Sequence, residues 1–203
     1  MITSKIIGLE MATSNSRRNA DAREDDLYTT PPWAVRALMK RVNLPGIIVD
    51  AGCGTGNIIN TLVEGGYDPD DIITVDKYSH DYTPDILMDY CKFTPYDLPN
   101  TVITNPPFKL FTEFVNHSLS IASEMVCVFA RINSLETATR FQDIYKDNPP
   151  SDVYLFVERV KCAKGGKDSS GNNSVFYCWL VWNLTTPNIP TILHWISEKA
   201  GQQ

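Results

Sequence analysis

Short runs of apolar, mostly β-branched residues recur along the chain, and they alternate with segments whose apolar residues are spaced three and four apart. Short apolar runs predict buried strands, and the three-and-four spacing predicts amphipathic helices. The predicted strands are 47–50, 72–76, 86–88, 101–104, 125–130, 153–160 and 175–181. The predicted helices run from Pro31 to about Arg41, across Ile58–Val63 and across Leu110–Leu119. This alternation predicts an α/β fold, with a mostly parallel sheet and helices on both faces.

The last two predicted strands differ from the others in how they are connected. A loop rich in Gly, Lys, Ser and Asn, from Ala163 to Ser174, separates them, which predicts a C-terminal β-hairpin added to the sheet. The expected sheet therefore has seven strands. Residues 1–27 are polar and predict an N-terminal arm, 28–190 form the expected domain, and 191–203 are expected to be a C-terminal tail.

Composition narrows the classes of protein that fit. The chain has 203 residues and is 43% hydrophobic, which is enough for one sizeable core. With 18 basic and 24 acidic residues its formal charge is −6, so contact with nucleic acid requires a local basic patch. The five cysteines are scattered, so no disulfide framework and no metal site are expected. No apolar run approaches the ~20 residues of a membrane span and no export signal is evident, which predicts a cytoplasmic location.

A glycine-rich loop follows the first predicted strand. Asp50 ends that strand, and Gly52, Gly54 and Gly56 follow at alternate positions before a helix. Ligands of open α/β sheets bind at such strand-to-helix loops, because glycine lets the backbone approach the ligand closely. Asp76 ends the second strand, where a carboxylate can accept both hydroxyls of a ribose. The alternative is a tight turn without a ligand.

A second motif, Asn105-Pro106-Pro107-Phe108, follows the strand 101–104. An exocyclic amine on an aromatic ring is a poor nucleophile, because its lone pair is delocalised into the ring. The Asn105 amide oxygen and the Pro106 carbonyl could both accept hydrogen bonds from such an amine and orient its lone pair for attack. Phe108 could stack on the base. The alternative is a simple proline turn, which is our interpretation of the second Asn-Pro-Pro sequence at 148–150.

These motifs carry a family resemblance. D-A-G-C-G-T-G at 50–56 resembles motif I of class I S-adenosylmethionine-dependent methyltransferases, and N-P-P-F resembles motif IV of N6-adenine DNA methyltransferases. Some rRNA guanine-N2 and protein-glutamine methyltransferases share that motif. Tyr28-Thr29-Thr30-Pro31 looks like motif X, and the order X, I, IV is similar to that of small phage and prophage adenine methyltransferases.

The resemblance implies a Rossmann-like methyltransferase fold over residues 28–190, with S-adenosylmethionine as the cofactor. Asn105, Pro106, Pro107 and Phe108 would be catalytic. The implied cofactor-binding residues are Tyr28, Thr29, Thr30, Pro31, Asp50, Gly52, Gly54, Gly56, Asp76, Asp89 and Tyr90. Two of these assignments have alternatives: the Thr30-Pro31 pair also suits a helix N-terminus, and Asp89 also suits an exposed loop.

A basic patch indicates the substrate. The expected nucleic-acid contacts are Lys109, Arg159, Lys161, Lys164 and Lys167, with an ordinary solvated loop as the alternative. His80, His117 and His194 have no carboxylate or serine partner at a telling spacing and are expected to have core or surface roles rather than catalytic ones. The favoured activity is methylation of the N6 amine of adenine in DNA after base flipping. The alternatives are an RNA base amino-methyltransferase and a catalytically silent subunit that binds cofactor or nucleic acid.

Overall fold

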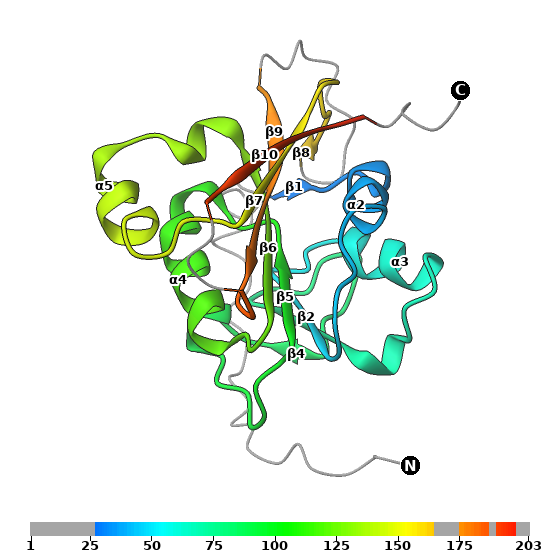
Figure 1. Cartoon of the computed structure of the whole chain (residues 1–203). Coiled ribbons are helices and arrows are strands. Elements are labelled where there is room, and N and C mark those ends of the chain that lie inside the picture. The colour runs from blue at the N-terminus through cyan, green and yellow to red at the C-terminus, as the bar shows by residue number, and fades with distance from the viewer. Residues whose placement is uncertain (1–26, 165–174, 187–189, 198–203) are drawn as a thin grey trace.

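The computed structural model describes residues 27–164, 175–186 and 190–197, and within them the main feature is an eight-stranded sheet (Figure 1). The strand order is β10-β7-β9-β6-β5-β2-β3-β4. The bounds are β2 Ile48–Ala51, β3 Ile72–Asp76, β4 Ile86–Leu87, β5 Thr101–Thr104, β6 Met125–Arg131, β7 Asp152–Phe156, β9 Tyr177–Asn183 and β10 Ile192–Ile196. Strands β4, β3, β2, β5 and β6 pair in parallel, whereas β9 is antiparallel to both β6 and β7. The α/β architecture expected from the sequence is confirmed.

The prediction of seven strands was wrong, because the sheet has an eighth strand, β10. This strand lies within the segment expected to be a tail, and it pairs in parallel with β7 at the edge of the sheet. Ile192, Leu193 and Trp195 are exposed and only Ile196 is fully buried, so the segment shows no clean apolar alternation. The predicted hairpin is present as the antiparallel pair of β7 and β9, although β7 ends at Phe156 rather than near Val160.

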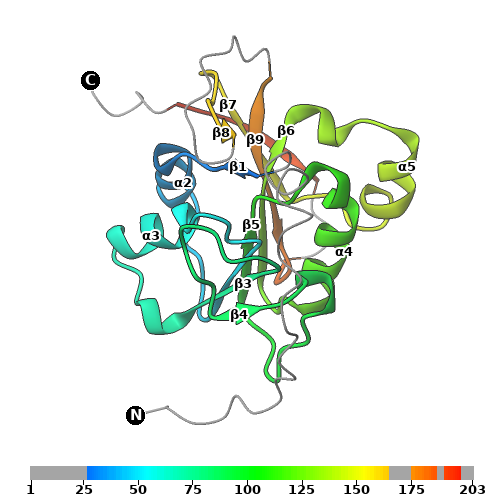
Figure 2. The same ribbon diagram turned by 180° about the vertical axis from the view of Figure 1, so that it is seen from behind.

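Helices cover both faces of the sheet. The helices are α2 Pro32–Met39, α3 Asn57–Glu64, α4 Phe111–Ile121 and the short α5 Ala138–Arg140. Single turns are η1 Pro69–Asp71, η2 Tyr90–Lys92, η3 Phe108–Leu110 and η4 Ile132–Leu135, and η5 Phe141–Tyr145 is a π-helix. Helices α2 and α3 pack on one face, and α4 and α5 lie on the other (Figures 1 and 2). Each face buries its own apolar cluster, as the alternation along each strand requires.

A second, two-stranded sheet joins two distant segments. Strand β1, Tyr28–Thr29, pairs antiparallel with β8, Ala163–Lys164, which lies in the connection between β7 and β9. The Thr29 hydroxyl also donates to the carbonyl of Ala163, 3.4 Å away. This ribbon holds the segment before α2 close to the carboxyl ends of the parallel strands.

The structure also bears on membrane insertion, metal binding and the cysteines. No helix among the described residues is long and apolar enough to cross a membrane, and these residues contain no cluster of side chains suited to a metal ion. All five cysteines are free thiols. The predicted N-terminal arm lies outside the described residues, apart from Leu27.

Candidate functional site

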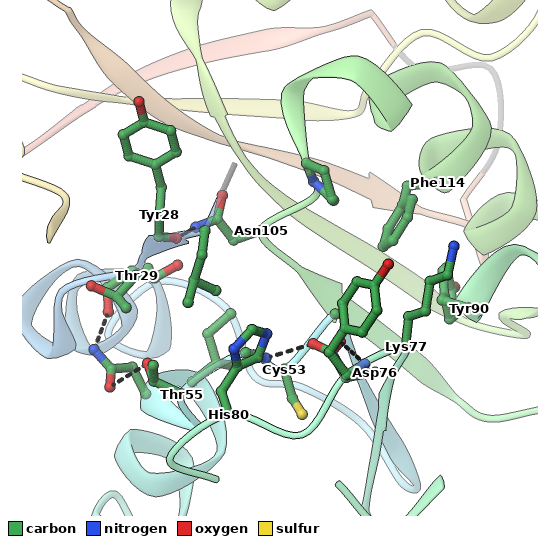
Figure 3. Close-up of a pocket in the computed structure, with 18 of the residues that line it drawn as sticks. Tyr28, Thr29, Cys53, Thr55, Asp76, Lys77, His80, Tyr90, Asn105 and Phe114 are labelled. Atoms are coloured by element: carbon green, nitrogen blue, oxygen red, sulfur yellow. Dashed lines mark hydrogen bonds between the residues drawn. The ribbon is translucent and has the colours of Figure 1, made fainter. Parts of the chain in front are cut away.

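A cavity of about 400 Å³ opens at the carboxyl edge of β2, β3 and β5 (Figure 3). Its lining residues come from β1 and its flanks, the glycine loop and the start of α3, the end of β3 and the β3–β4 loop, the start of η2, the segment after β5, and α4. They are Leu27, Tyr28, Thr29, Thr30, Gly52, Cys53, Gly54, Thr55, Asn57, Ile58, Asp76, Lys77, Tyr78, His80, Asp89, Tyr90, Asn105, Pro107, Leu110 and Phe114. The cavity therefore brings together residues from all three motifs found in the sequence.

The glycine loop has positive φ angles that residues with a side chain rarely adopt. Gly52, Gly54 and Gly56 have φ values of 69°, 54° and 76°, in the left-handed region that favours glycine. A Cβ on Gly52 would come within 3.3 Å of the Phe114 ring, and one on Gly56 within 2.6 Å of the Tyr82 ring. Side chains at these positions would fill or distort the space beside the loop.

Asp76 is the best-placed carboxylate of the cavity. It is nearly buried at the end of β3, where Oδ2 accepts the backbone N–H of Gly54 at 2.8 Å and Oδ1 that of Tyr78 at 2.9 Å. A carboxylate has about four acceptor positions, so two backbone bonds leave capacity for hydroxyl donors. Asp76 thus fixes the glycine loop and still offers acceptors to a ligand.

Asp50 has a different position from the one the resemblance implies. Its side chain is fully buried beneath the glycine loop and does not line the cavity. Oδ2 accepts the N–H of Ile59 at 3.3 Å, whereas Oδ1 has no hydrogen-bond partner among the described residues. Burial away from water raises the pKa of this carboxyl to about 7, the Ile59 bond lowers it, and the nearby Asp76 raises it.

The amide of Asn105 has a defined orientation. Its Nδ2 donates to the backbone carbonyl of Tyr28, 2.6 Å away (Figure 3). Since a carbonyl oxygen only accepts, the group facing Tyr28 must be the NH₂, and Oδ1 is the amide atom left for another donor. Asn105 is one of the residues that line the cavity.

The rest of the Asn-Pro-Pro-Phe segment surrounds this amide. Pro107 lines the cavity, whereas Pro106 is buried and is absent from the cavity wall. Phe108 is partly buried and does not line the cavity; its ring centroid lies 5.0 Å from that of Tyr28. Asn148, in the second Asn-Pro-Pro sequence, instead accepts the Trp182 indole N–H at its backbone oxygen, 2.9 Å away. That contact is consistent with a structural linker.

Three of the implied cofactor residues have mainly structural partners. The Tyr90 hydroxyl bonds to the Ser118 hydroxyl at 2.8 Å, and burial raises the pKa of Tyr90 well above its usual range. Asp89 accepts the N–H of Cys91 at 3.2 Å and lines the cavity. Pro31 precedes α2 as its N-cap and is absent from the cavity wall. The pair therefore does precede a helix, as the alternative interpretation requires, and Thr30 lines the cavity.

The β3–β4 loop supplies residues that the sequence analysis did not assign to the site. Lys77, Tyr78 and His80 all line the cavity, and the His80 ring meets that of Tyr78 edge-on at 6.4 Å. Their position directly after the strand-ending Asp76 was the signal that could have identified them. His117 contacts the Phe93 carbonyl at 2.9 Å, in keeping with a structural role.

The predicted basic patch lies outside the cavity. Lys109, Arg159 and Lys161 are exposed, and none of them lines it. Lys164 pairs through its backbone with Tyr28, and Lys167 lies outside the described residues.

Comparison with known proteins identifies the fold. No protein-family model matches the sequence, and no curated protein matches it significantly. A Listeria monocytogenes protein, provisionally assigned to class I S-adenosylmethionine-dependent methyltransferases, superposes with a TM-score of 0.57 at 12% identity, over 83% of this chain and 65% of that one. The methyltransferase subunit of a type I restriction-modification system from Streptococcus thermophilus superposes with a TM-score of 0.59 at 11% identity. The match covers 84% of this chain and 47% of that one.

A third solved structure matches over a larger share of its own length. A Pyrococcus horikoshii protein provisionally described as an RNA methyltransferase gives a TM-score of 0.50 at 15% identity, over 79% of this chain and 87% of that one. The chain spans just under two thirds of the Listeria protein and about half of the Streptococcus subunit. At these identities the likeness concerns the fold, and by its fold the chain is similar to class I S-adenosylmethionine-dependent methyltransferases.

Proposed function

We propose that the protein uses S-adenosylmethionine to methylate the exocyclic N6 amine of adenine in DNA, with the target base flipped into the site beside Asn105. The observation that carries this proposal is the amide of the cavity-lining Asn105, whose NH₂ is held by the Tyr28 carbonyl, so that Oδ1 is the atom left to accept. An acceptor fixed in this way suits an NH₂ group on a planar ring.

The donors and acceptors of the cavity fit the proposed cofactor. The positive-φ glycines leave open space that a Cβ at Gly52 would narrow, and Asp76 offers acceptors suited to a ribose. Tyr78, from the β3–β4 loop, adds an aromatic side chain beside that carboxylate. When bound, S-adenosylmethionine supplies an electrophilic methyl group on a sulfonium. Asp50, beneath the loop, would support the loop rather than touch the cofactor.

Asn105 would act by orientation rather than as a base. A hydrogen bond from the target amine to Oδ1 draws the nitrogen toward tetrahedral geometry, which frees its lone pair from the ring. The backbone carbonyl of Pro106 could accept the second N–H. Because the NH₂ of Asn105 is already held by Tyr28, the acceptor needs no reorganisation when the substrate arrives.

DNA is favoured over RNA for two reasons. The order of the three motifs resembles that of DNA adenine methyltransferases, and the matched structures include a restriction-modification subunit. The exposed Lys109, Arg159 and Lys161 could contact the phosphates of either nucleic acid. The fold itself does not separate the two substrates, because an RNA methyltransferase candidate shares it.

The test is transfer of a tritiated methyl group from S-adenosylmethionine to unmethylated DNA and, separately, to total RNA, followed by nucleoside analysis. We expect N6-methyladenine in DNA. Label in RNA alone would replace the proposal with the RNA alternative. Cofactor binding without transfer to either nucleic acid would support a catalytically silent binding subunit.

A further inference from the structure

Arg131 lies beside the Asn-Pro-Pro-Phe segment and has no part in the proposed reaction. Arg131 is the last residue of β6, and its Cζ lies 3.6 Å from the centroid of the Phe108 ring. The same carbon lies 5.6 Å from the centroid of the Tyr28 ring. At 3.6 Å the guanidinium stacks on one face of Phe108, which is the geometry of a close cation–π contact. A stacked base would have only the other face available.

The guanidinium is held from the side of the sheet. Arg131 lies directly opposite Tyr177 in the antiparallel pair of β6 and β9. The Tyr177 ring in turn stacks on Phe129, with centroids 4.9 Å apart and planes within 8°. Phe129 and Tyr177 are both buried, so Arg131 extends from a rigid part of the core.

The position of Arg131 leaves one of its polar atoms unpaired within the described part of the chain. The Nε atom of Arg131 is buried and has no hydrogen-bond partner among the described residues. A buried donor without an acceptor destabilises a fold, so stability alone does not account for an arginine here. What the arginine provides is a planar cation that packs against the aromatic ring of the Asn-Pro-Pro-Phe segment.

We propose that Arg131 is a positioning residue for the target base, acting through Phe108. It holds the Phe108 ring against the sheet and beside Tyr28, so that the ring is oriented before a flipped base stacks on it. The proposal rests on the proposed function, because a target base is what Phe108 would stack on. No contact between Arg131 and the substrate is required.

A double-mutant cycle tests this dependence on Phe108. Wild type, Arg131→Met, Phe108→Ala and the double variant are compared by kcat/KM for methyl transfer to unmethylated DNA. Arg131→Met should lower kcat/KM by roughly 3- to 30-fold, the range of a cation–π contact. In the Phe108→Ala background it should change kcat/KM by no more than about twofold, because the ring it positions is gone. Affinity for S-adenosylmethionine should be the same in all four proteins.

Arg140→Met is the matched control. Arg140 is also partly buried, and its Cζ lies 5.4 Å from the centroid of Phe111, a ring absent from the cavity wall. It should leave kcat/KM near wild type although it removes the same charge. Effects of Arg131→Met and Phe108→Ala that simply multiply would overturn the proposal, because Arg131 would then act independently of the ring.

Failure of the proposed function and failure of the role of Arg131 give different results. If only RNA accepts the methyl group, DNA methylation is disproved and the same cycle on RNA decides the role of Arg131. If neither nucleic acid is methylated, the four proteins are compared by urea unfolding. Coupled effects on unfolding would then support positioning of Phe108, and additive effects would overturn it.

Discussion

Asn105 donates its side-chain amide to the backbone carbonyl of Tyr28, across 2.6 Å and 77 positions of sequence. The bond connects the segment after β5 to β1, and β1 is itself paired with β8. Three segments that are far apart along the chain therefore determine which atom of Asn105 is left for a substrate. The proposed chemistry depends on that orientation.

Replacing Asn105 should stop methyl transfer without weakening the binding of the cofactor. Asn105→Ala removes the acceptor for the target amine, and one preorganised polar contact of this kind is worth roughly 10²–10³ in rate. Calorimetry should give near-normal affinity for S-adenosylmethionine, and tritium transfer should be almost lost.

The chain contains its own control for that experiment. Asn148→Ala changes the same residue type in the second Asn-Pro-Pro sequence, where the backbone oxygen, not the side chain, receives the Trp182 bond. It should leave transfer unchanged. Loss of activity in Asn148→Ala together with normal activity in Asn105→Ala would assign the catalytic role to the second Asn-Pro-Pro sequence and disprove the mechanism proposed for Asn105.

Phe108→Ala should weaken the capture of the target base and leave cofactor binding intact. Loss of base stacking typically costs about 1–3 kcal/mol. The measurement is kcat/KM for DNA beside calorimetric affinity for S-adenosylmethionine. A variant that loses cofactor affinity and keeps kcat/KM for DNA would contradict a stacking role.

Cofactor binding should depend on the glycine loop. Gly52→Val places a branched side chain at φ 69° and within reach of Phe114, so it should abolish S-adenosylmethionine binding. Asp76→Ala should weaken binding by on the order of 1–3 kcal/mol for lost charge-assisted hydrogen bonds. Calorimetry measures both effects, with circular dichroism to check that each variant is folded. Wild-type affinity in Gly52→Val would refute the assignment of the loop.

Asp50 should make stability depend on pH. Burial raises the pKa of its carboxyl from 3.8 to about 7, so between these values the folded protein binds a proton that the unfolded chain has lost. Stability should therefore fall as pH rises through this window, by on the order of a few kcal/mol, and level off above it. Urea unfolding at pH 5 and pH 8 should show a smaller fall for Asp50→Asn. An identical fall in the two proteins would mean that Asp50 is not the titrating group.

Binding to DNA should weaken with salt despite the net negative charge. Replacing Lys161, Lys164 and Lys167 with Ala should reduce the slope of log affinity against log salt by up to about 3, if each lysine neutralises one phosphate. Replacing Lys40, Lys92 and Lys146, which are exposed elsewhere on the surface, removes the same charge and should leave the slope unchanged. Equal slopes for both triple variants would assign the loop lysines to ordinary solvation.

The sequence by itself determined the features that depend on short, local patterns of residues. Strands β3 and β5 have the predicted bounds, β2 is displaced by one residue, and β6 extends one residue further than predicted. The agreement is close because buried parallel strands need continuous apolar runs. The Gly52–Gly56 loop and Asn105 lie at strand ends, as predicted, because their motifs directly follow such runs. Parallel strands then bring these loops to one edge of the sheet.

Only the tertiary structure decided the contacts between distant segments. Strand β10 depends on pairing with β7. Most of its side chains are exposed, and its apolar residues do not alternate with polar ones, so its sequence alone does not predict a strand. Burial of Asp50 follows from the packing of α3 over the loop, which no local motif encodes. The partners of Asn105 and Phe108, namely Tyr28 and Arg131, come from other strands. Hydrogen bonds and ring contacts form between neighbours in space, and only the folded chain determines those neighbours.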